Sequence, residues 1–175
     1  MEELSGTVLA GDSFEPVSGR VVVEDGRIEA VEETDTASDD IVVPAFVNAH
    51  THLGDSVAKD AAVGLSLSEA VAPPDSLKHR RLAAADRSEL VAAMRRTLQY
   101  AAETGTVSCL DFRESGVAGA EALRAAAAPL SVDPFIFGSD DVSVLDVADG
   151  YGASGANDED FSAERAATAE RDQPF

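Results

Sequence analysis

The sequence has little of what several classes of protein require. It contains one cysteine, Cys109, so an internal disulfide is impossible and a cluster of thiolate metal ligands is excluded. Charge or proline interrupts its apolar runs well short of the ~20 residues that a membrane-spanning helix needs. Residues 1–4 lack the basic and apolar segments that open a secretory signal. These absences favour a cytoplasmic protein that has no membrane partner.

Positive charge is also scarce. Lysine and arginine together number 13 against 33 aspartates and glutamates, which gives a net charge of -20 at pH 7. A nucleic-acid-binding surface needs a basic patch, and an anionic membrane would repel so acidic a chain. The sequence therefore favours a small-molecule substrate over a nucleic acid or a membrane.

The kind of charge carries further information. Lys59 and Lys78 are the only lysines among the 13 basic residues, and alanine is abundant. An acidic surplus with scarce lysine is typical of a cytoplasmic protein from a salt-accumulating halophile, because such a surface stays soluble in concentrated salt and repels itself in dilute buffer. An ordinary acidic protein is the alternative.

The first 47 residues read as strands. Residues 4–33 alternate between apolar and polar, and Asp25–Gly26 between two alternating runs predicts a hairpin. Residues 34–40 form a polar connector. The nearly continuous apolar run 41–47 predicts a strand buried on both faces, as in a parallel sheet.

Strands and helices then alternate. Asp86 and Glu89 predict the start of a helix that ends at Gly105. The later elements are strands at 106–112, 133–138 and 142–148 and helices at 117–128 and 162–172, the last preceded by the acidic run 158–160. With 45% apolar residues the chain can bury a core. We predict an α/β fold with a small β segment at 1–40 and βα units at 41–175.

Two of the three histidines, His50 and His52, directly follow the apolar run. In an extended chain, residues two apart project to the same face, so both imidazoles can point at one spot beyond the end of the strand. Imidazole suits Zn, Fe and Mn alike, so this spacing predicts a divalent metal site without naming the metal. A pair of ordinary exposed loop histidines is the alternative.

The residues around this pair resemble a known family. The string Val43-Pro44-Ala45-Phe46-Val47-Asn48-Ala49-His50-Thr51-His52 is similar to the first-strand signature of the amidohydrolase superfamily, with Ala45 where glycine is usual. The preceding β-rich stretch looks like that family's small β-sandwich. The ending of the strand at 106–112 looks like the cytosine-deaminase-like and chlorohydrolase-like branch. The resemblance covers essentially the whole chain.

The resemblance implies a TIM-type (β/α)8 barrel. Such barrels take ~250 residues, so residues 41–175 suffice for about four βα units, the N-terminal half of the barrel. The family's further metal ligands and its catalytic acid or base would then lie beyond Phe175. The resemblance implies a hydrolase that acts on a non-peptide carbon–nitrogen bond through metal-activated water. Some members of the family hold a second metal through a lysine at the end of the fourth strand. No lysine ends the fourth predicted strand here, so the resemblance implies one divalent metal, with zinc first and iron or manganese as alternatives.

Four other residues are candidates for the site. His79 and Arg113 are candidates for binding substrate, with a solvated helix start and an ion pair to Glu114 or Asp140 as the alternatives. Asp55 and Asp149 are candidates for orienting a ligand, with turn roles as the alternatives.

Two other readings of the chain stay open. Two histidines leave a metal half-coordinated and half a barrel exposes unpaired strand edges, so the chain is either truncated and inactive or completed by a homo-oligomer or by a partner that carries the remaining strands. An acidic β/α binding module with incidental histidines is the last alternative.

Overall fold

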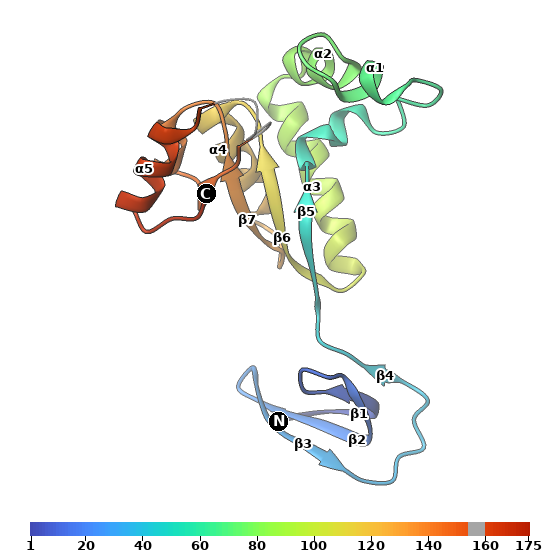
Figure 1. The fold of residues 1–175 in the computed structure, drawn as a ribbon. Coiled ribbons are helices and arrows are strands. Elements are labelled where there is room, and N and C mark those ends of the chain that lie inside the picture. Colours follow the sequence, from blue (N-terminus) through green and yellow to red (C-terminus); the bar gives the residue numbers. More distant parts are fainter. Residues whose placement is uncertain (154–159) are drawn as a thin grey trace. The chain divides into compact units, whose positions relative to one another are not determined.

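The computed structural model describes residues 1–153 and 160–175 and divides the chain into two units, Met1–Ala45 and Phe46–Phe175 (Figure 1). The division falls after Ala45, later than the predicted boundary at residue 40. The reason is that the apolar run 41–47 is shared between two sheets. Its first residues, Ile41 and Val42, pair with the first strand of the chain, and Phe46 begins the second sheet.

The first unit is a four-stranded mixed sheet. Its strands are β1 (Glu2–Ala10), β2 (Glu15–Glu24), β3 (Arg27–Glu33) and β4 (Ile41–Val42), in the order β3-β2-β1-β4. The predicted hairpin is confirmed: β2 and β3 are antiparallel, and Asp25 and Gly26 both adopt the positive φ of a tight turn. Only the β1–β4 pair is parallel. Val8 and Val21 are the buried apolar side chains of this unit.

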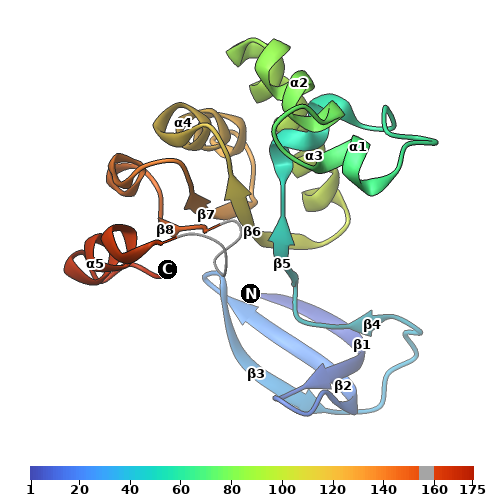
Figure 2. The same cartoon turned by 45° about the horizontal axis from the view of Figure 1, so that its top comes forward.

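The second unit is a parallel sheet in the order β5-β6-β7-β8. Helices α3 and α4 lie on one face of it (Figure 2). Its elements are β5 (Phe46–Thr51), η1 (Leu53–Ala58), α1 (Leu67–Val71), α2 (Leu77–Ala84), α3 (Arg87–Glu103), β6 (Thr106–Arg113), α4 (Gly116–Ala127), β7 (Asp133–Gly138), η2 (Val142–Asp146), β8 (Gly150–Tyr151) and α5 (Ser162–Glu170).

The core of this unit lies between the sheet and the two helices. The predicted start of α3 is confirmed, because Asp86 and Glu89 form a reciprocal capping box. Its apolar face buries Met94 and Leu98 completely. Fully buried side chains from the neighbouring elements complete the core, namely Leu123, Ile136 and Val144. Within residues 1–153 and 160–175, no helix combines the length and apolar character needed to cross a membrane.

The predicted strand at 142–148 is wrong. Val142–Asp146 is a 3-10 helix, because the Asp141 carboxylate accepts the Ser143 amide and starts a helical turn. Val144 packs against Gly138, where an added Cβ would lie 2.2 Å from a Val144 methyl group. The fourth strand is the shorter β8, and it pairs with the carboxyl end of β7.

The predicted burial of the strand around residue 46 is also wrong. Phe46 and Val47 are 58% and 59% exposed, because β5 pairs with β6 on one side and, among the described residues, with no strand on the other. The predicted acidic run at 158–160 lies partly outside the described residues. Its last member, Asp160, accepts the Ser162 amide at the start of α5.

Candidate functional site

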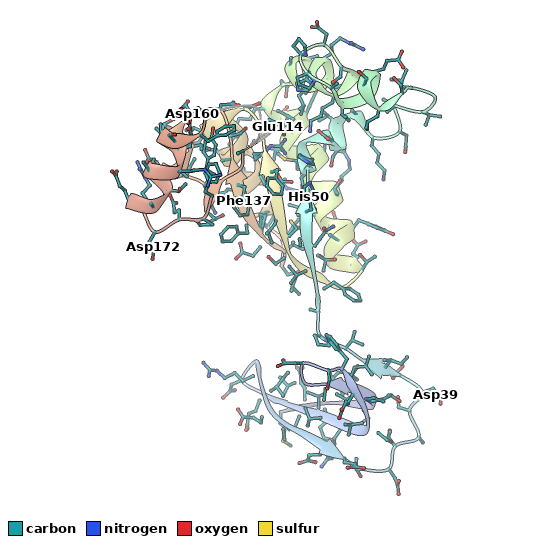
Figure 3. All side chains as sticks on the ribbon, viewed as in Figure 1. Asp39, His50, Glu114, Phe137, Asp160 and Asp172 are labelled. Atoms are coloured by element: carbon teal, nitrogen blue, oxygen red, sulfur yellow. The ribbon has the colours of Figure 1, made fainter. Side chains whose placement is uncertain are left out.

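The two neighbouring histidines converge at the carboxyl end of β5. His50 is the penultimate residue of that strand, and Figure 3 shows its side chain at this end of the sheet. His52 follows the strand and precedes η1, with φ -130° and ψ 72°. The two Nε2 atoms are 3.3 Å apart. The rings therefore meet at one point, as the spacing in the sequence predicts.

This separation suits two ligands of one ion. Two nitrogens that each bind a tetrahedral zinc at ~2.0–2.1 Å stand about 3.3 Å from one another. His50 and His52 could therefore hold a metal without moving apart. Among the residues that the structure describes, no group of three or more histidine, cysteine, aspartate or glutamate side chains is arranged to hold a metal. A metal held by this pair would need further ligands.

Glu114 faces the other nitrogen of His52. Its Oε1 lies 3.6 Å from His52 Nδ1. This carboxylate raises the pKa of His52, because it accepts the proton that the ring carries at Nδ1, although burial and Lys78 act in the opposite direction. A proton held at Nδ1 leaves the Nε2 lone pair directed toward His50, which is the arrangement of a carboxylate behind a metal-binding imidazole.

Glu114 is itself held by two cations. Lys78 Nζ lies 2.5 Å from its Oε1, and Arg113 Nη2 bonds to its Oε2. Burial raises the pKa of Glu114, but the His52 contact and the two cations outweigh burial and hold that pKa well below its usual range. Glu114 is therefore ionised beside His52. Lys78 also reaches Asp55 Oδ2 at 3.1 Å, which links Asp55 to the same network.

Sequence reasoning missed Lys78 and the role of Glu114. It placed Glu114 only as a candidate ion-pair partner of Arg113. The structure favours that ion-pair alternative for Arg113, whose side chain is 3% exposed and also reaches Asp111 and the sulfur of Met94. Arg113 is thus a support for Glu114 and does not present its guanidinium at an open surface.

Two of the predicted site residues lie elsewhere. His79 bonds through Nδ1 to the hydroxyl of Ser76 at the start of α2, 2.7 Å away. Asp149 accepts the Ile136 amide at 2.8 Å and pairs with Arg124 at 3.1 Å. Among the described residues no hydrogen bond or ion pair joins either of them to His50 or His52, and their roles stay predictions.

An aromatic wall lies beside the imidazoles. The ring of Phe112 is 4.7 Å from that of His50 and 5.9 Å from that of His52, centroid to centroid. Phe137, labelled on β7 in Figure 3, stacks on Phe112 at 5.3 Å with an interplanar angle of 14°. The histidine pair is therefore bordered by aromatic rings on the side of β6 and β7.

Comparison with known proteins identifies the family of the chain. The model of the amidohydrolase family matches residues 41–172, so the chain belongs to the amidohydrolase family. It is 35% identical over 174 residues to a protein of Methanothermobacter thermautotrophicus named "Putative aminohydrolase", covering 86% of this chain and 45% of that protein. A protein of Archaeoglobus fulgidus with the same name is 36% identical over 125 residues, covering 71% and 36%.

Solved structures share the fold. Atrazine chlorohydrolase from Arthrobacter aurescens, determined in complex with zinc, matches with a TM-score of 0.53 at 14% identity over 77% of this chain and 34% of that one. The similarity supports an α/β fold related to that enzyme's. The chain spans about 45% of the length of the first of these relatives and 36% of the second.

Proposed function

We propose that this chain is part of a metal-dependent hydrolase that acts on a non-peptide carbon–nitrogen bond, by hydrolysis of a cyclic amide or amidine or by deamination. The observation that carries the proposal is the 3.3 Å separation of the His50 and His52 Nε2 atoms, with Glu114 behind His52. Membership of the amidohydrolase family supports a hydrolase. That membership also disfavours the alternative of an acidic binding module with incidental histidines.

The proposed cofactor is one divalent metal, with zinc first and iron or manganese as alternatives. His50 and His52 would hold it through Nε2. The chemistry that such an ion supplies when bound is activation of water as a nucleophile and polarisation of the scissile group. Glu114 would keep the His52 proton at Nδ1 and fix the plane of the ring. Phe112 would exclude water from one side and offer a flat wall to the substrate.

The remaining ligands and the general acid or base are expected from protein outside this sequence. A strand edge that is exposed at β5 supports a partner, which would be a polypeptide that carries the remaining strands or a second copy of the chain. Under this proposal the chain alone binds metal weakly and turns over little, and the completed assembly is the enzyme.

Zinc titration against a chromophoric chelator tests the metal site. We expect His50→Ala and His52→Ala each to weaken zinc binding at least ~10-fold, because each removes a ligand. His79→Ala is the matched control, since it also removes a histidine, one whose imidazole bonds to Ser76. Zinc binding that survives loss of both imidazoles would overturn the proposed function.

Turnover tests the chemistry separately. Release of ammonia from a panel of aminated heterocycles, together with ring opening of cyclic amides, would be followed with zinc present. Activity that depends on His50 and His52 supports an enzyme. A specific activity (turnover per chain) that rises with protein concentration, together with an oligomer in sedimentation, supports completion by a second copy. A chain that binds zinc tightly yet turns over no compound of either class would contradict the proposed reaction.

A further inference from the structure

Asp111 is a completely buried carboxylate on the face of β6 that packs against the helices. It lies opposite Thr51 in the register of β5 and β6, and its side chain is 0% exposed. Its Oδ2 accepts the Thr51 hydroxyl at 2.9 Å and the Leu53 amide at 2.5 Å. These two donors come from the residues immediately before and after His52. The Thr51 hydroxyl also lies 3.0 Å from the Leu110 carbonyl, so its one proton is shared between two acceptors of β6. The Asp111 carboxylate therefore contacts the residues on both sides of a candidate metal ligand.

The backbone at this point needs such support. The register of β5 against β6 shifts between Asn48 and Thr51, so the ladder of strand hydrogen bonds is irregular where His50 lies. Beyond Thr51 the strand has ended, and His52 adopts a conformation that is neither strand nor helix. Contacts from β6 to Thr51 and Leu53 therefore define the course of the main chain on either side of His52, while Glu114 contacts its ring.

The neighbouring layer leaves this segment little freedom. Arg113 Nη1 lies 3.4 Å from Asp111 Oδ1, which compensates the buried charge. A Cβ added at Gly54 would lie 2.2 Å from Arg113 Nη2, so the chain approaches this guanidinium as closely as glycine permits. The backbone at Gly54 therefore lies directly against Arg113, and the Leu53 amide donates to Asp111.

We propose that Asp111 is a positioning residue, which fixes the turn around His52 so that its imidazole meets that of His50 at the separation a shared metal ion requires. This inference rests on the proposed metal site. Asp111 itself touches neither the metal nor the substrate. Its carboxylate acts through the Thr51 hydroxyl and the Leu53 amide, and it is distinct from Glu114, which contacts the ring of His52 directly.

The acceptor oxygen can be tested by paired substitutions and zinc titration. Asp111→Ala removes both bonds and should weaken zinc binding ~10-fold, in the range typical of residues that support metal ligands. Asp111→Asn keeps an amide oxygen for both donors and should stay within ~3-fold of the original chain. Thr51→Val should weaken binding ~3-fold, and Thr51→Ser, which keeps the hydroxyl, should restore it. Because the Thr51 hydroxyl also contacts the Leu110 carbonyl, the Thr51 pair tests the whole tether between the two strands, and it stands in if Asp111→Ala does not fold.

A control separates positioning from general stability. Val144→Ala trims a completely buried core side chain of η2 that packs against Gly138. It should lower the melting temperature and leave zinc affinity unchanged. If Val144→Ala weakens zinc binding as much as Asp111→Ala, or if Asp111→Ala binds zinc as well as the original chain, the positioning role is wrong.

A second readout needs no metal. Cross-relaxation between the ring protons of His50 and His52 should be measurable by NMR in the original chain and in Thr51→Ser, and should weaken in Thr51→Val and Asp111→Ala. Unchanged cross-relaxation in all four proteins would overturn the inference. If the original chain shows the cross-relaxation yet binds no zinc, the proposed metal function fails while the positioning of the rings by Asp111 stands.

Discussion

The two units carry the same net charge on very different lengths of chain. Residues 1–45 contain 12 acidic and 2 basic residues, a net of -10, and residues 46–175 contain 21 and 11, also -10. The first unit buries the apolar side chains of Val8 and Val21, whereas the second has a continuous core of aliphatic side chains. Charge repulsion should therefore limit the stability of the first unit, and packing should determine that of the second.

The placement of the tyrosines makes this difference measurable. Tyr100 and Tyr151 are the only tyrosines, and the sequence has no tryptophan. Tyrosine fluorescence therefore reports on the second unit alone, while circular dichroism reports on both. Unfolding curves from the two signals should separate where the units respond differently.

The largest expected effect is a core truncation in the second unit. Ile136→Ala removes a completely buried side chain on β7 and should cost about 3 kcal/mol of unfolding free energy, because it leaves a cavity. Urea unfolding followed by tyrosine fluorescence measures this loss. The strand signal of the first unit should not move. A parallel loss in both signals would show that the units unfold together and would break the comparison.

Salt should act mainly on the first unit. Raising KCl from 0.1 to 2 M screens its dense negative charge, and we expect the melting temperature followed by circular dichroism to rise by roughly 5–10 °C. The melting temperature from tyrosine fluorescence should rise less. NaCl at equal ionic strength is the control for a general salt effect. Equal melting at both salt concentrations would contradict the halophilic interpretation of the composition.

Alkaline pH should act on the second unit through Cys109. Burial, aided by the Asp111 charge, raises the pKa of this thiol to about 11. The folded chain keeps the proton that the unfolded chain releases from about pH 9 upward. The thiol's contribution to stability is therefore complete below pH 9 and is lost as the pH rises toward 11.

The size of this effect follows from the shift. Between pH 8 and pH 10.5 the original chain should lose ~2 kcal/mol more unfolding free energy than Cys109→Ala, which carries no titrating thiol. Urea unfolding followed by circular dichroism measures both proteins, and their difference cancels other groups that titrate. If the unfolding free energy fell equally with pH in the two proteins, the pKa of the Cys109 thiol would not be raised by folding.

The sequence predicted the part of the site that one short segment of the chain supplies, which is the histidine pair. His50 and His52 are two positions apart, so the geometry of one strand was enough to place both rings together. Glu114 and Lys78 come from other segments of the chain, and nothing in the sequence near His52 indicates that a carboxylate and an ammonium group will meet there. Their roles depend on how β6 and α2 pack.

The two wrong predictions have different physical causes. The pattern at 142–148 suits a strand or one turn of helix, and the carboxylate of Asp141 decides for the helix by capping it. The apolar run at 41–47 predicts burial only if both edges of the strand are paired. An apolar run indicates what a strand prefers to pack against, and it does not indicate whether that neighbour is in the same chain.

The smallest expected effect on stability is on β5, where the second unit resembles the first in exposing apolar side chains. Val47→Ser should change the unfolding free energy by less than ~0.5 kcal/mol, because the side chain is already 59% exposed. Association should change instead. If the exposed edge of β5 pairs with a second copy, the variant should sediment more as a monomer, with Val107→Ser on β6 as the control for a half-exposed valine inside the sheet. A loss of stability as large as that of a core truncation would mean that Val47 is covered in solution, and the edge would then already have its partner.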